Sequence, residues 1–359
     1  MHRPSSEFQI GDKSVGIGHP TYFIADVAAN HDGDLERAKA LIHLAAEAGA
    51  DAAKFQHFAA KTIVSDTGFR TLGGQMSHQA RWEKSVFEVY EDASVDPGWT
   101  PELKAACDEA GITFFTTPYS YELVEAVDPY VPAYKIGSGD VTWLHFIRHV
   151  AGKGKPCLLA SGASTADEVA RAVSAMLEVN PDVVLMQCNT NYTASLENFR
   201  FIQLNVLQSY RSMYPDMILG LSDHTPGHAT VLGAVTLGAR VVEKHFTDDV
   251  SRDGPDHAFS MDPRTWADMV VRTRELEQAL GNGIKKVEDN ERETVVVQRR
   301  AIRTTRPLSA GTVLKPDDLT CLRPCPEEGL APYELERVIG RTVRSELTEG
   351  QHLRWLDLQ

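Results

Sequence analysis

Short apolar runs alternate with longer amphipathic stretches along most of the chain. Eight runs have the length and composition of buried strands, at residues 22–25, 51–55, 112–116, 133–136, 157–160, 183–186, 217–221 and 240–243. Between them, apolar residues spaced three and four apart predict helices, including those at 35–48, 101–110, 166–179 and 196–214. Eight strand and helix units in sequence predict an α/β fold, a closed parallel (β/α)8 TIM barrel.

An open doubly wound sheet is the alternative arrangement for the same alternation. Such a sheet favours a glycine-rich phosphate motif after its first strand, and the segment ADVAANHDG at 25–33 does not have that spacing. We therefore expect the barrel. One of its helices also carries a clear start signal, because Ser164 or Thr165 can cap the helix from 166 and Glu168 can complete a capping box.

Polar side chains follow every one of the eight predicted strands. In a parallel barrel these positions gather at one mouth, where the active sites of this fold lie. In chain order they are Asp26, Asn30 and His31; Lys54 and Gln56; Thr117; Lys135 and Ser138; Ser161; Asn189, Thr190, Asn191 and Tyr192; Ser222, Asp223 and His224; and Glu243 and His245. One polar residue after a strand is ordinary for a loop, but polar residues after all eight strands predict an active site.

The last predicted strand leads into a highly charged segment, GARVVEKHFTDDVSRDGPDHAFSMDP at 238–263. Side chains alternate along a strand, so Glu243 and His245 should share one face and Lys244 should lie on the other. Gly254 and Pro255 then turn the loop and bring Asp256 back over the same strand end. A solvated acidic loop is the plainer interpretation of this segment alone. A second segment, GLSDHT at 220–225, argues against it by placing an apolar run directly before His224.

Lys54 and Lys135 lie inside apolar strand ends, in AAKFQ and AYKIG. Burying an unpaired ammonium is costly, so each lysine either pairs with a carboxylate of the barrel or binds an anion. Both should point into the same mouth as the hydroxyls of Thr117, Ser138 and Ser161, and we therefore favour phosphate and carboxylate binding over internal ion pairs. A Schiff base on one of the lysines is the main rival chemistry.

His224 and His245 follow adjacent predicted strands, so their rings can meet at one point above the barrel. Two imidazoles without an obvious third protein ligand leave positions for water and substrate oxygen. That arrangement suits an octahedral Mn²⁺, Mg²⁺ or Co²⁺ better than a closed structural zinc site. From the residues alone, metal binding and simple hydrogen bonding of the two histidines are about equally favoured.

Composition narrows the class of protein. The 359 residues, with 42% hydrophobic content, are enough for one large and one small globular domain. A formal charge of −14 argues against a nucleic-acid partner, because phosphate backbones require a basic face. The N-terminus has no apolar signal-peptide core and no run is long enough to span a membrane, so we expect a cytoplasmic protein without a membrane partner.

The five cysteines include no CxxC pair and are odd in number, which suits reduced thiols. Cys157 and Cys188 fall in apolar runs, and we expect both in the core. Cys321 and Cys325 have no partner pair nearby and do not predict a metal site.

A change in composition after Leu280 marks a domain boundary. Residues 285–297 are rich in charge and form a predicted linker between a barrel at 1–284 and a small domain at 298–359, where short apolar runs alternate with turn signals. The longest gap between strands, 56–111, contains the polar and aromatic stretch GGQMSHQARWEKSVFEVYE. We expect that gap to form a lid or an interface.

Several motifs in order make the chain resemble the sialic acid (N-acetylneuraminate) synthases, nonulosonic acid synthases with a C-terminal antifreeze-like (SAF) domain. The motifs are EKHFTDDVSRDGPDHAFSMDP, GLSDHT, ADVAANHDG, AAKFQ, FFTTP, AYKIGSGD and a C-terminal region that begins QRRAIRTTRPLSAG. The resemblance covers nearly the whole chain. It implies an enzyme that condenses phosphoenolpyruvate with an N-acylmannosamine-type sugar aldehyde, forming a nine-carbon 2-keto-3-deoxy sugar acid and phosphate by C–O cleavage.

The resemblance also implies roles for individual residues. For the two histidines it favours metal binding over simple hydrogen bonding, with Mn²⁺ ahead of Mg²⁺ and Co²⁺. It further implies a domain-swapped homodimer whose SAF domain covers the partner's barrel mouth. The implied metal ligands are His224 and His245; the catalytic residues Asp26, Glu243, Lys54 and Lys135; and the substrate-binding residues Gln56, Thr117, Ser138, Ser161, Thr190, Tyr192, Asp256 and, from the SAF domain, Arg323.

The sequence also departs from the family pattern. Asp26 stands where the family usually has glutamate, Ala160 where the first residue of Ser-Thr-Gly is usual, and Cys325 where a glycine is usual after Arg-Pro. These changes suggest an altered sugar or weakened activity. Two other classes of function therefore stay open: a metal-dependent sugar isomerase or aldolase on the same barrel, and a non-catalytic carbohydrate-binding relative.

Overall fold

The computed structural model describes residues 1–72, 79–80 and 82–359, and the chain divides into two compact units, Met1–Gly281 and Asn282–Gln359. Residues 73–78 and 81, within the gap at 56–111 that is predicted to form a lid or an interface, lie outside the described residues.

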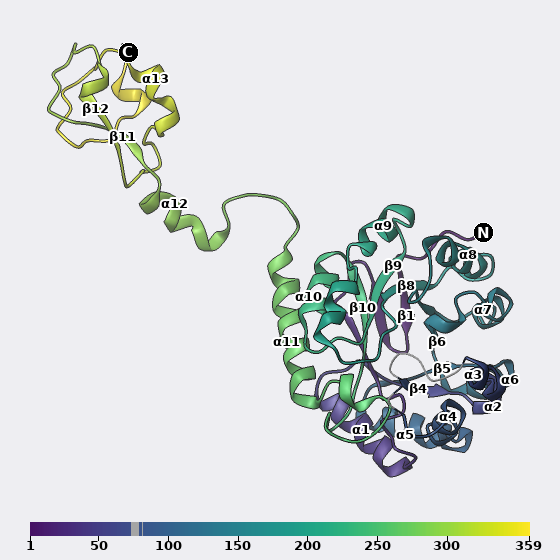
Figure 1. Cartoon of the computed structure of the whole chain (residues 1–359). Helices are drawn as coiled ribbons and strands as arrows, with labels where there is room; N and C mark the ends of the chain where they lie inside the picture. Colours follow the sequence, from purple (N-terminus) through teal and green to yellow (C-terminus); the bar gives the residue numbers. More distant parts are fainter. Residues whose placement is uncertain (73–78, 81) are drawn as a thin grey trace. The chain divides into compact units, whose positions relative to one another are not determined.

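The first unit is a closed barrel of eight parallel strands surrounded by helices (Figure 1). Each predicted strand run corresponds to one barrel strand, and the barrel closes where the last strand pairs with the first. The predicted TIM barrel is therefore confirmed. Its strands are β3 (Tyr22–Asp26), β4 (Ala52–His57), β5 (Thr113–Pro118), β6 (Tyr134–Ile136), β7 (Cys157–Ala160), β8 (Val183–Cys188), β9 (Ile218–Asp223) and β10 (Ala239–His245).

The helices follow the predicted pattern with one clear exception. α8 begins at the expected capping box of Thr165 and Glu168. The single helix predicted over 196–214 is wrong, because a 3₁₀ segment, η5 (Leu196–Phe201), is separated from α9 (Val206–Met213) at Gln203, whose φ of 53° is left-handed. The other barrel helices are α1 (Leu35–Glu47), α2 (Ala60–Ile63), α3 (Asp66–Thr71), α4 (Val86–Asp92), α5 (Thr100–Ala110), α6 (Tyr121–Val127), α7 (Leu144–Ala151), α8 (Ala166–Leu177), α10 (Ala229–Thr236) and α11 (Pro263–Leu280).

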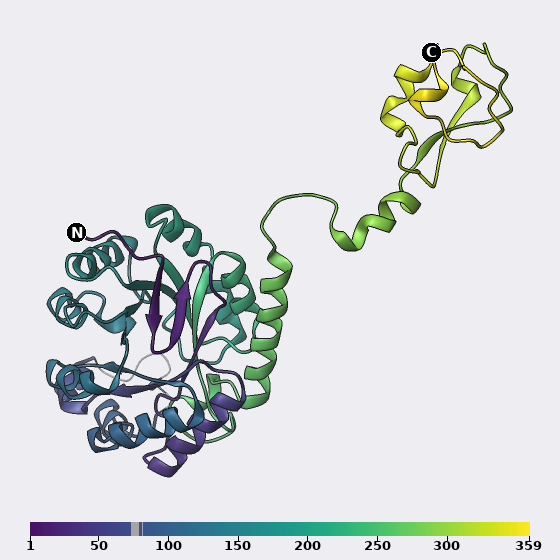
Figure 2. The same ribbon diagram turned by 180° about the vertical axis from the view of Figure 1, so that it is seen from behind.

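An N-terminal hairpin of β1 (Glu7–Ile10) and β2 (Lys13–Gly16) fills the N-terminal end of the barrel (Figure 2). Its residues Phe8, Ile10 and Val15 are buried with inward-facing residues at the starts of the barrel strands. A second, larger apolar core lies between the outer side of the strands and the helices. The strands are therefore buried on both faces, as expected for a parallel barrel.

The second unit has a small core of its own, which includes Ile302, Leu314, Val338, Val343 and Leu353. It contains an antiparallel pair, β11 (Ala301–Thr304) and β12 (Leu319–Leu322), and a short helix, α13 (Leu335–Val338). The segment expected to be a plain linker carries structure, since α12 (Arg292–Gln298) begins within it.

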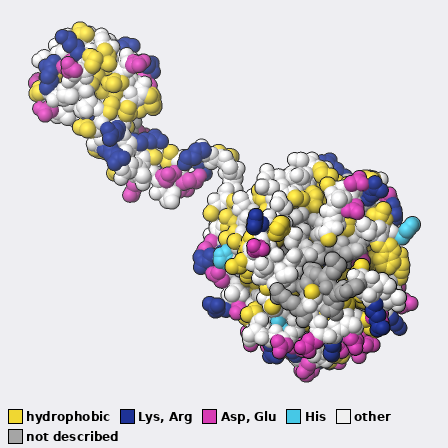
Figure 3. Space-filling model, viewed as in Figure 1, with side chains coloured by type: hydrophobic (Ala, Val, Ile, Leu, Met, Phe, Trp, Pro, Cys, Tyr) yellow, Lys and Arg dark blue, Asp and Glu magenta, His cyan; other side chains and the backbone are white. Residues whose placement is uncertain are grey.

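The surface of the first unit is of mixed charge on the face that Figure 3 shows, where acidic and basic side chains are interspersed around the barrel. Among the described helices, none combines the length and the apolar character that crossing a bilayer requires.

Candidate active site

Alternation along β9 and β10 separates their polar residues into two groups. The strands are paired so that Glu243 lies beside Ser222 and Lys244 beside Asp223. Glu243 and Ser222 line a cavity at the C-terminal end of the barrel, whereas Lys244 and Asp223 are buried on the opposite side. His245, two residues after Glu243, also faces the cavity, which confirms that this pair shares one face of its strand.

The cavity has a volume of about 400 Å³ and collects polar side chains from strands all around the barrel. Ser161 is a predicted site residue of the first unit that is not part of this lining, and Arg323 belongs to the second unit. The predicted residues that do line it are Asp26, Lys54, Gln56, Thr117, Lys135, Ser138, Thr190, Tyr192, His224, Glu243, His245 and Asp256.

The floor of the cavity holds two buried lysines and two buried carboxylates. Lys54 Nζ lies 2.7 Å from Asp26 Oδ2 and 3.6 Å from Glu243 Oε1, and Lys135 Nζ lies 3.3 Å from the same Glu243 oxygen. Both lysines thus form internal ion pairs, the alternative that we ranked below anion binding. Ser222 donates to Glu243 Oε1 at 3.1 Å, while Glu243 Oε2 is buried without a hydrogen-bond partner among the described residues.

These ion pairs keep Lys54 charged. Burial by itself disfavours the ammonium form, but the carboxylates of Asp26 and Glu243 outweigh burial and raise the pKa of Lys54. A protonated lysine is a ligand for anions and a poor nucleophile. The electrostatics of the floor therefore favour anion binding over a Schiff base at this residue.

Two histidine rings meet above the floor, as their adjacent strands predicted. The centroids of His224 and His245 are 5.3 Å apart, and Phe259 packs against both, at 5.8 and 4.8 Å. Tyr192 lies against His224 with ring centroids 4.3 Å apart. This packing fixes the orientation of both imidazoles.

The two histidines differ in their partners and in the direction of their pKa shifts. His224 Nδ1 lies 3.0 Å from the carbonyl oxygen of Asn189, and the ring also contacts the Cys188 thiol, which outweighs burial and raises the pKa of His224. His245 Nδ1 is buried without a hydrogen-bond partner among the described residues, and burial lowers the pKa of His245 well below its usual value. A neutral imidazole is the form that binds metals.

The protein supplies two ligands at this point. Within the part of the chain that the structure describes, no group of three or more histidine, cysteine and acidic side chains is arranged to hold a metal ion. The residues present therefore fit a site in which two imidazoles leave the remaining positions to water and substrate oxygen.

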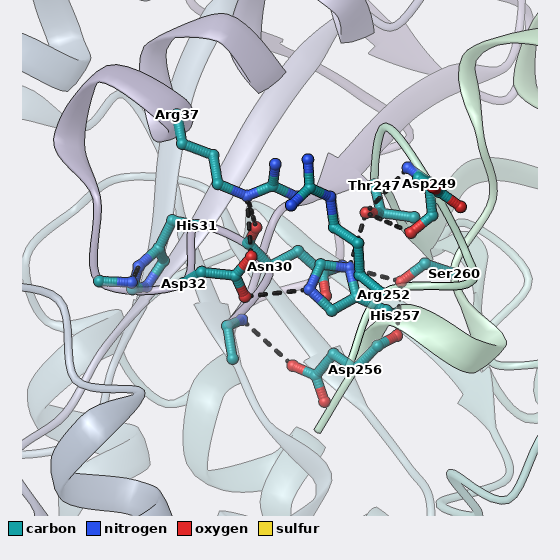
Figure 4. Close-up of polar contacts among 12 residues, drawn as sticks. Asn30, His31, Asp32, Arg37, Thr247, Asp249, Arg252, Asp256, His257 and Ser260 are labelled. Atoms are coloured by element: carbon teal, nitrogen blue, oxygen red, sulfur yellow. Dashed lines mark hydrogen bonds and ion pairs between the residues drawn. The ribbon is translucent and has the colours of Figure 1, made fainter. Parts of the chain in front are cut away.

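The loop after β10 brings Asp256 to the rim of the cavity. Asp256 Oδ2 accepts a hydrogen bond of 3.1 Å from the backbone N–H of Ala29, in the loop after β3 (Figure 4). The neighbouring His257 is fully buried, with Nε2 3.0 Å from Asp32 Oδ1 and Nδ1 2.7 Å from Thr247 Oγ1. The predicted return of this loop over the strand end is confirmed.

Further contacts tie the same two loops together. The guanidinium of Arg37 donates to both oxygens of Asp248, at 2.9 and 2.7 Å, and to the carbonyl oxygen of Asn30 at 2.8 Å. Gly254 passes so close to His257 that an added Cβ would lie 2.6 Å from its Cδ2. The loops after the first and last barrel strands are thus fixed to each other, and Asp256 is fixed with them.

The predicted position of Cys188 is wrong. It was expected in the core, but it ends β8 and lines the cavity beside His224 and Ser138. Burial opposes ionisation of this thiol, yet His224 outweighs burial and lowers the pKa of Cys188. The available signal was alternation, because Val184 and Met186 on the same strand face the barrel interior.

Ser161 is placed differently from the prediction. Its hydroxyl donates to the carbonyl oxygen of Met186 at 3.0 Å, and Ala160 lines the cavity in its stead. The following residue, Gly162, lies where three cavity side chains converge, since an added Cβ would come within 1.9 Å of Thr190 Oγ1 and 2.9 Å of Ser138 Oγ. The hydrogen bond from Ser161 therefore ties the end of β7 to β8, next to the point where Thr190 and Ser138 meet at Gly162.

Sequence reasoning also missed Asp140 and an aromatic wall. Asp140 lines the cavity, and its Oδ2 is buried without a hydrogen-bond partner among the described residues. Burial raises the pKa of Asp140 to about 6, with Lys135 opposing the shift. The wall comes from the predicted lid or interface gap, which contributes Phe58, Ile63, Trp82, Val89, Tyr90 and Ala93 to the lining.

Comparison with known proteins identifies the family. The chain matches the NeuB family over residues 41–285 and the SAF domain over residues 299–359. The chain belongs to the NeuB family. The resemblance drawn from its motifs and the expected C-terminal SAF domain are both confirmed.

Several relatives of this NeuB-family chain are named as synthases of legionaminic, pseudaminic or N-acetylneuraminic acids. N,N'-diacetyllegionaminic acid synthase of Legionella pneumophila is 32% identical over 351 residues, 96% of each chain. N-acetylneuraminate-9-phosphate synthase of Homo sapiens is 30% identical over 330 residues, 92% of this chain and 90% of that one. Among solved structures, N-acetylneuraminic acid synthetase from Leptospira borgpetersenii has a TM-score of 0.71 at 27% identity and covers 82% of this chain and 97% of its own.

Proposed function

We propose that this chain condenses phosphoenolpyruvate with the aldehyde of a six-carbon, N-acylmannosamine-type sugar. The product is a nine-carbon 2-keto-3-deoxy sugar acid, and phosphate leaves by C–O cleavage. The observation that carries the proposal is the convergence of Lys54 and Lys135 on Glu243 in the floor of a cavity that two imidazoles, His224 and His245, also line. The named activities of the NeuB relatives support the same chemistry.

In this proposal the floor binds the enolpyruvate. Lys54 and Lys135 hold its carboxylate and phosphate, and they exchange part of their contact with Glu243 for the new anion. Thr117, 3.4 Å from Lys54 Nζ, and Ser138 add hydroxyl donors. The loss of a long ion pair is small beside the gain of a phosphate contact, because the present distances of 3.3 and 3.6 Å to Glu243 are not optimal.

C3 of the enolpyruvate forms a bond to the aldehyde carbon, whose oxygen takes up a proton and becomes a hydroxyl. Water adds at C2 and gives a proton to Glu243 or Asp26. The C2–O bond to phosphate breaks, its electron pair leaves with the phosphate, and loss of the second water proton produces the keto group. Glu243 Oε2, buried and without a partner in the described structure, is the acceptor best placed for this proton.

His224 and His245 are the side chains that hold a divalent metal in this proposal, Mn²⁺ first and Mg²⁺ or Co²⁺ as alternatives. When bound, such an ion acts as a Lewis acid toward the sugar aldehyde. The protein's own part is to keep His245 neutral through burial and to orient both rings, through the Asn189 carbonyl at His224 and the packing of Phe259.

Arg323 enters the proposal through a second subunit. In this structure its Nε donates to the Gln298 carbonyl oxygen at 2.6 Å, and its side chain is exposed. We propose a homodimer in which the SAF domain of one subunit presents Arg323 to the sugar at the other. Light scattering of the full chain and the sugar KM of Arg323→Ala test this part separately.

The experiment uses phosphoenolpyruvate with ¹⁸O in the bridging oxygen, Mn²⁺, and a panel of six-carbon aldoses and 2-acetamido sugars, with a chelator control. We expect phosphate release that requires both a particular sugar and the metal, and that carries the label, because C–O cleavage leaves the bridging oxygen on phosphorus. Unlabelled phosphate contradicts the proposed cleavage. Sugar that is isomerised or cleaved without consumption of phosphoenolpyruvate indicates the isomerase or aldolase alternative. If there is no turnover and calorimetry detects no binding of phosphoenolpyruvate, the chain is a non-catalytic relative.

A further inference from the structure

The loop after β10, residues 246–262, is held by backbone contacts at its two ends. Phe246 and Met261 form an isolated parallel bridge, and the N–H of Thr247 donates to the Met261 carbonyl oxygen at 3.0 Å. Between these ends the regular element of the described loop is the short 3₁₀ turn η6 (His257–Phe259). A loop with so little regular structure depends on side-chain contacts for a single conformation.

Arg37, in the first turn of α1, reaches this loop from outside. Its guanidinium donates to both oxygens of Asp248, at 2.9 and 2.7 Å. On its other side, Nε donates to the carbonyl oxygen of Asn30 at 2.8 Å. The Arg37 side chain is only 14% exposed, and its hydrogen bonds lower the pKa of Asp248, so the pair stays ionised. Such a bidentate pair fixes orientation as well as distance, and it joins the loop after β10 to the loop after β3.

A second set of contacts leads from Arg37 toward the cavity. Asp32 lies between Arg37 and His257, with Oδ2 3.0 Å from Arg37 Nε and Oδ1 3.0 Å from His257 Nε2 (Figure 4). His257 is fully buried, and its Nδ1 lies 2.7 Å from Thr247 Oγ1. The residue before His257 is Asp256, which lines the cavity. The position of Asp256 therefore depends on contacts made outside the cavity.

The hydrogen bond of Asp256 itself crosses between the two loops. Its Oδ2 accepts from the N–H of Ala29, in the loop after β3, so this contact lasts only while the loops stay together. Neither Arg37 nor Asp248 is among the described residues that line the cavity. Arg37 can therefore act on the cavity only through the loops that it joins.

Asp256 is suited to the sugar rather than to phosphoenolpyruvate. A carboxylate repels an anion and accepts hydrogen bonds from hydroxyl groups. In the proposed function the sugar aldehyde lies beside His224 and His245, and Asp256 Oδ2 lies 3.9 Å from His245 Nδ1. Building on that function, we propose that Arg37 is a positioning residue for the sugar. It holds the two loops together so that the Asp256 carboxylate meets a sugar hydroxyl.

The test measures steady-state phosphate release by the full-length chain with Mn²⁺, using the sugar of the panel above that is turned over fastest. Arg37→Met keeps the length of the side chain and removes its hydrogen-bond donors. We expect kcat/KM for the sugar to fall by about 10- to 100-fold, because a displacement of about 1 Å at a site has an effect of this size. The KM for phosphoenolpyruvate should be unchanged, because Lys54 and Lys135 project from barrel strands.

The matched control is Arg252→Met. Arg252 also donates to Asp248, from Nε and Nη2 at 3.1 Å each, but both residues belong to the loop after β10 and their contact does not join the two loops. Its loss should change kcat/KM for the sugar by about 5-fold or less. An equal loss in Arg37→Met and Arg252→Met would overturn the proposal.

A double variant separates positioning from general stability. In an Asp256→Ala background, the further change Arg37→Met should lower kcat/KM for the sugar by no more than about 2-fold, because the carboxylate that Arg37 positions is gone. The full loss in that background, or an equal rise in the KM for phosphoenolpyruvate, indicates a merely structural role and overturns the proposal.

Hydrogen exchange measures the connection of the loops without turnover. Peptides from 246–262 should exchange faster in Arg37→Met than in Arg252→Met. Asp248→Asn keeps the shape of the acidic side chain and should change both exchange and sugar kinetics in the same direction as Arg37→Met. It serves as the test variant if Arg37→Met does not fold.

The outcomes separate this inference from the proposed function. Unchanged sugar kinetics in Arg37→Met and Asp248→Asn overturn the inference and leave the condensation intact. No sugar-dependent phosphate release by the unaltered chain overturns the proposed function, and the inference with it.

Discussion

Two buried lysine and carboxylate clusters lie on opposite sides of the barrel wall, and they are satisfied to different degrees. In the outer cluster, Lys244 Nζ lies 2.5 Å from Asp223 Oδ2 and 2.5 Å from the carbonyl oxygen of Thr225. Asp223 also accepts hydroxyl hydrogen bonds of 2.7 Å from Thr225 and Thr230. In the inner cluster, the contacts to Glu243 are 3.3 and 3.6 Å, and one of its oxygens lacks a partner in the described structure.

The difference is the one expected between a charge cluster that stabilises the fold and one that, under the proposed function, binds a ligand. Buried charges without full pairing are costly, so proteins normally complete their hydrogen bonds. The outer cluster follows that rule, and neither Lys244 nor Asp223 lines the cavity. The inner cluster departs from it at the point where the cavity lies, which is expected of a site that completes its contacts with substrate. Neighbouring residues of one strand, Glu243 and Lys244, belong to different clusters because side chains alternate.

The largest expected effect is on stability, from the outer cluster. Lys244→Met leaves the Asp223 carboxylate buried without its ion pair and should lower the free energy of unfolding by about 3–5 kcal/mol. Urea denaturation followed by circular dichroism measures the change. The control is Lys104→Met, at an exposed pair with Asp108 on α5, which should change stability by less than about 1 kcal/mol. Equal effects of the two variants would contradict the comparison.

The inner cluster should respond in activity. Under the proposed function, Lys135→Met removes one of the two lysines that bind the enolpyruvate and should lower the rate of sugar-dependent phosphate release by about 10²- to 10³-fold. Its stability should change by no more than about 1 kcal/mol, because Glu243 keeps Lys54 and Ser222 as partners. Both quantities are measured on one preparation. A loss of stability as large as that of Lys244→Met, with activity retained in the folded fraction, would reverse the assignment of the two clusters.

A smaller, pH-dependent effect is expected at Asp140, a further cavity carboxylate that lacks a full set of partners. Burial raises its pKa to about 6 in the folded protein from its usual 3.8, so the folded state binds this proton more tightly than the unfolded state. Ionisation of Asp140 therefore lowers stability as pH rises through this window. Asp140→Asn removes that cost, and its free energy of unfolding relative to the native chain should increase between about pH 4 and pH 7. Urea curves with no pH dependence in this difference would show that Asp140 is well solvated.

Much of the barrel and of its mouth was predictable, for physical reasons. Strands buried on both faces appear as continuous apolar runs, and parallel strands bring their C-terminal ends to one edge. Lys54 and Lys135 were recognisable because an ammonium inside an apolar run needs a partner. The pattern could not say which partner, since the pairing with Asp26 and Glu243 depends on distances across the barrel.

The remaining features depend on geometry that the pattern does not carry. Ser161 follows its strand as expected, but the rotation of its side chain toward Met186 is a tertiary contact. The left-handed residue Gln203 has no glycine or proline to announce the break that it makes in the predicted helix. Cys188 looked like core because inward and outward positions of a buried strand are equally apolar until the strand reaches the mouth.

The hairpin that fills the lower end of the barrel also bears on the order in which ligands bind. Phe8, Ile10 and Val15 occupy the end opposite the cavity, so the floor is approached from the mouth. Under the proposed function, phosphoenolpyruvate lies at the floor with Lys54 and Lys135, and the sugar lies between it and the mouth. The sugar then covers the enolpyruvate and slows its escape, and steady-state kinetics should show a compulsory sequence with phosphoenolpyruvate as the leading substrate.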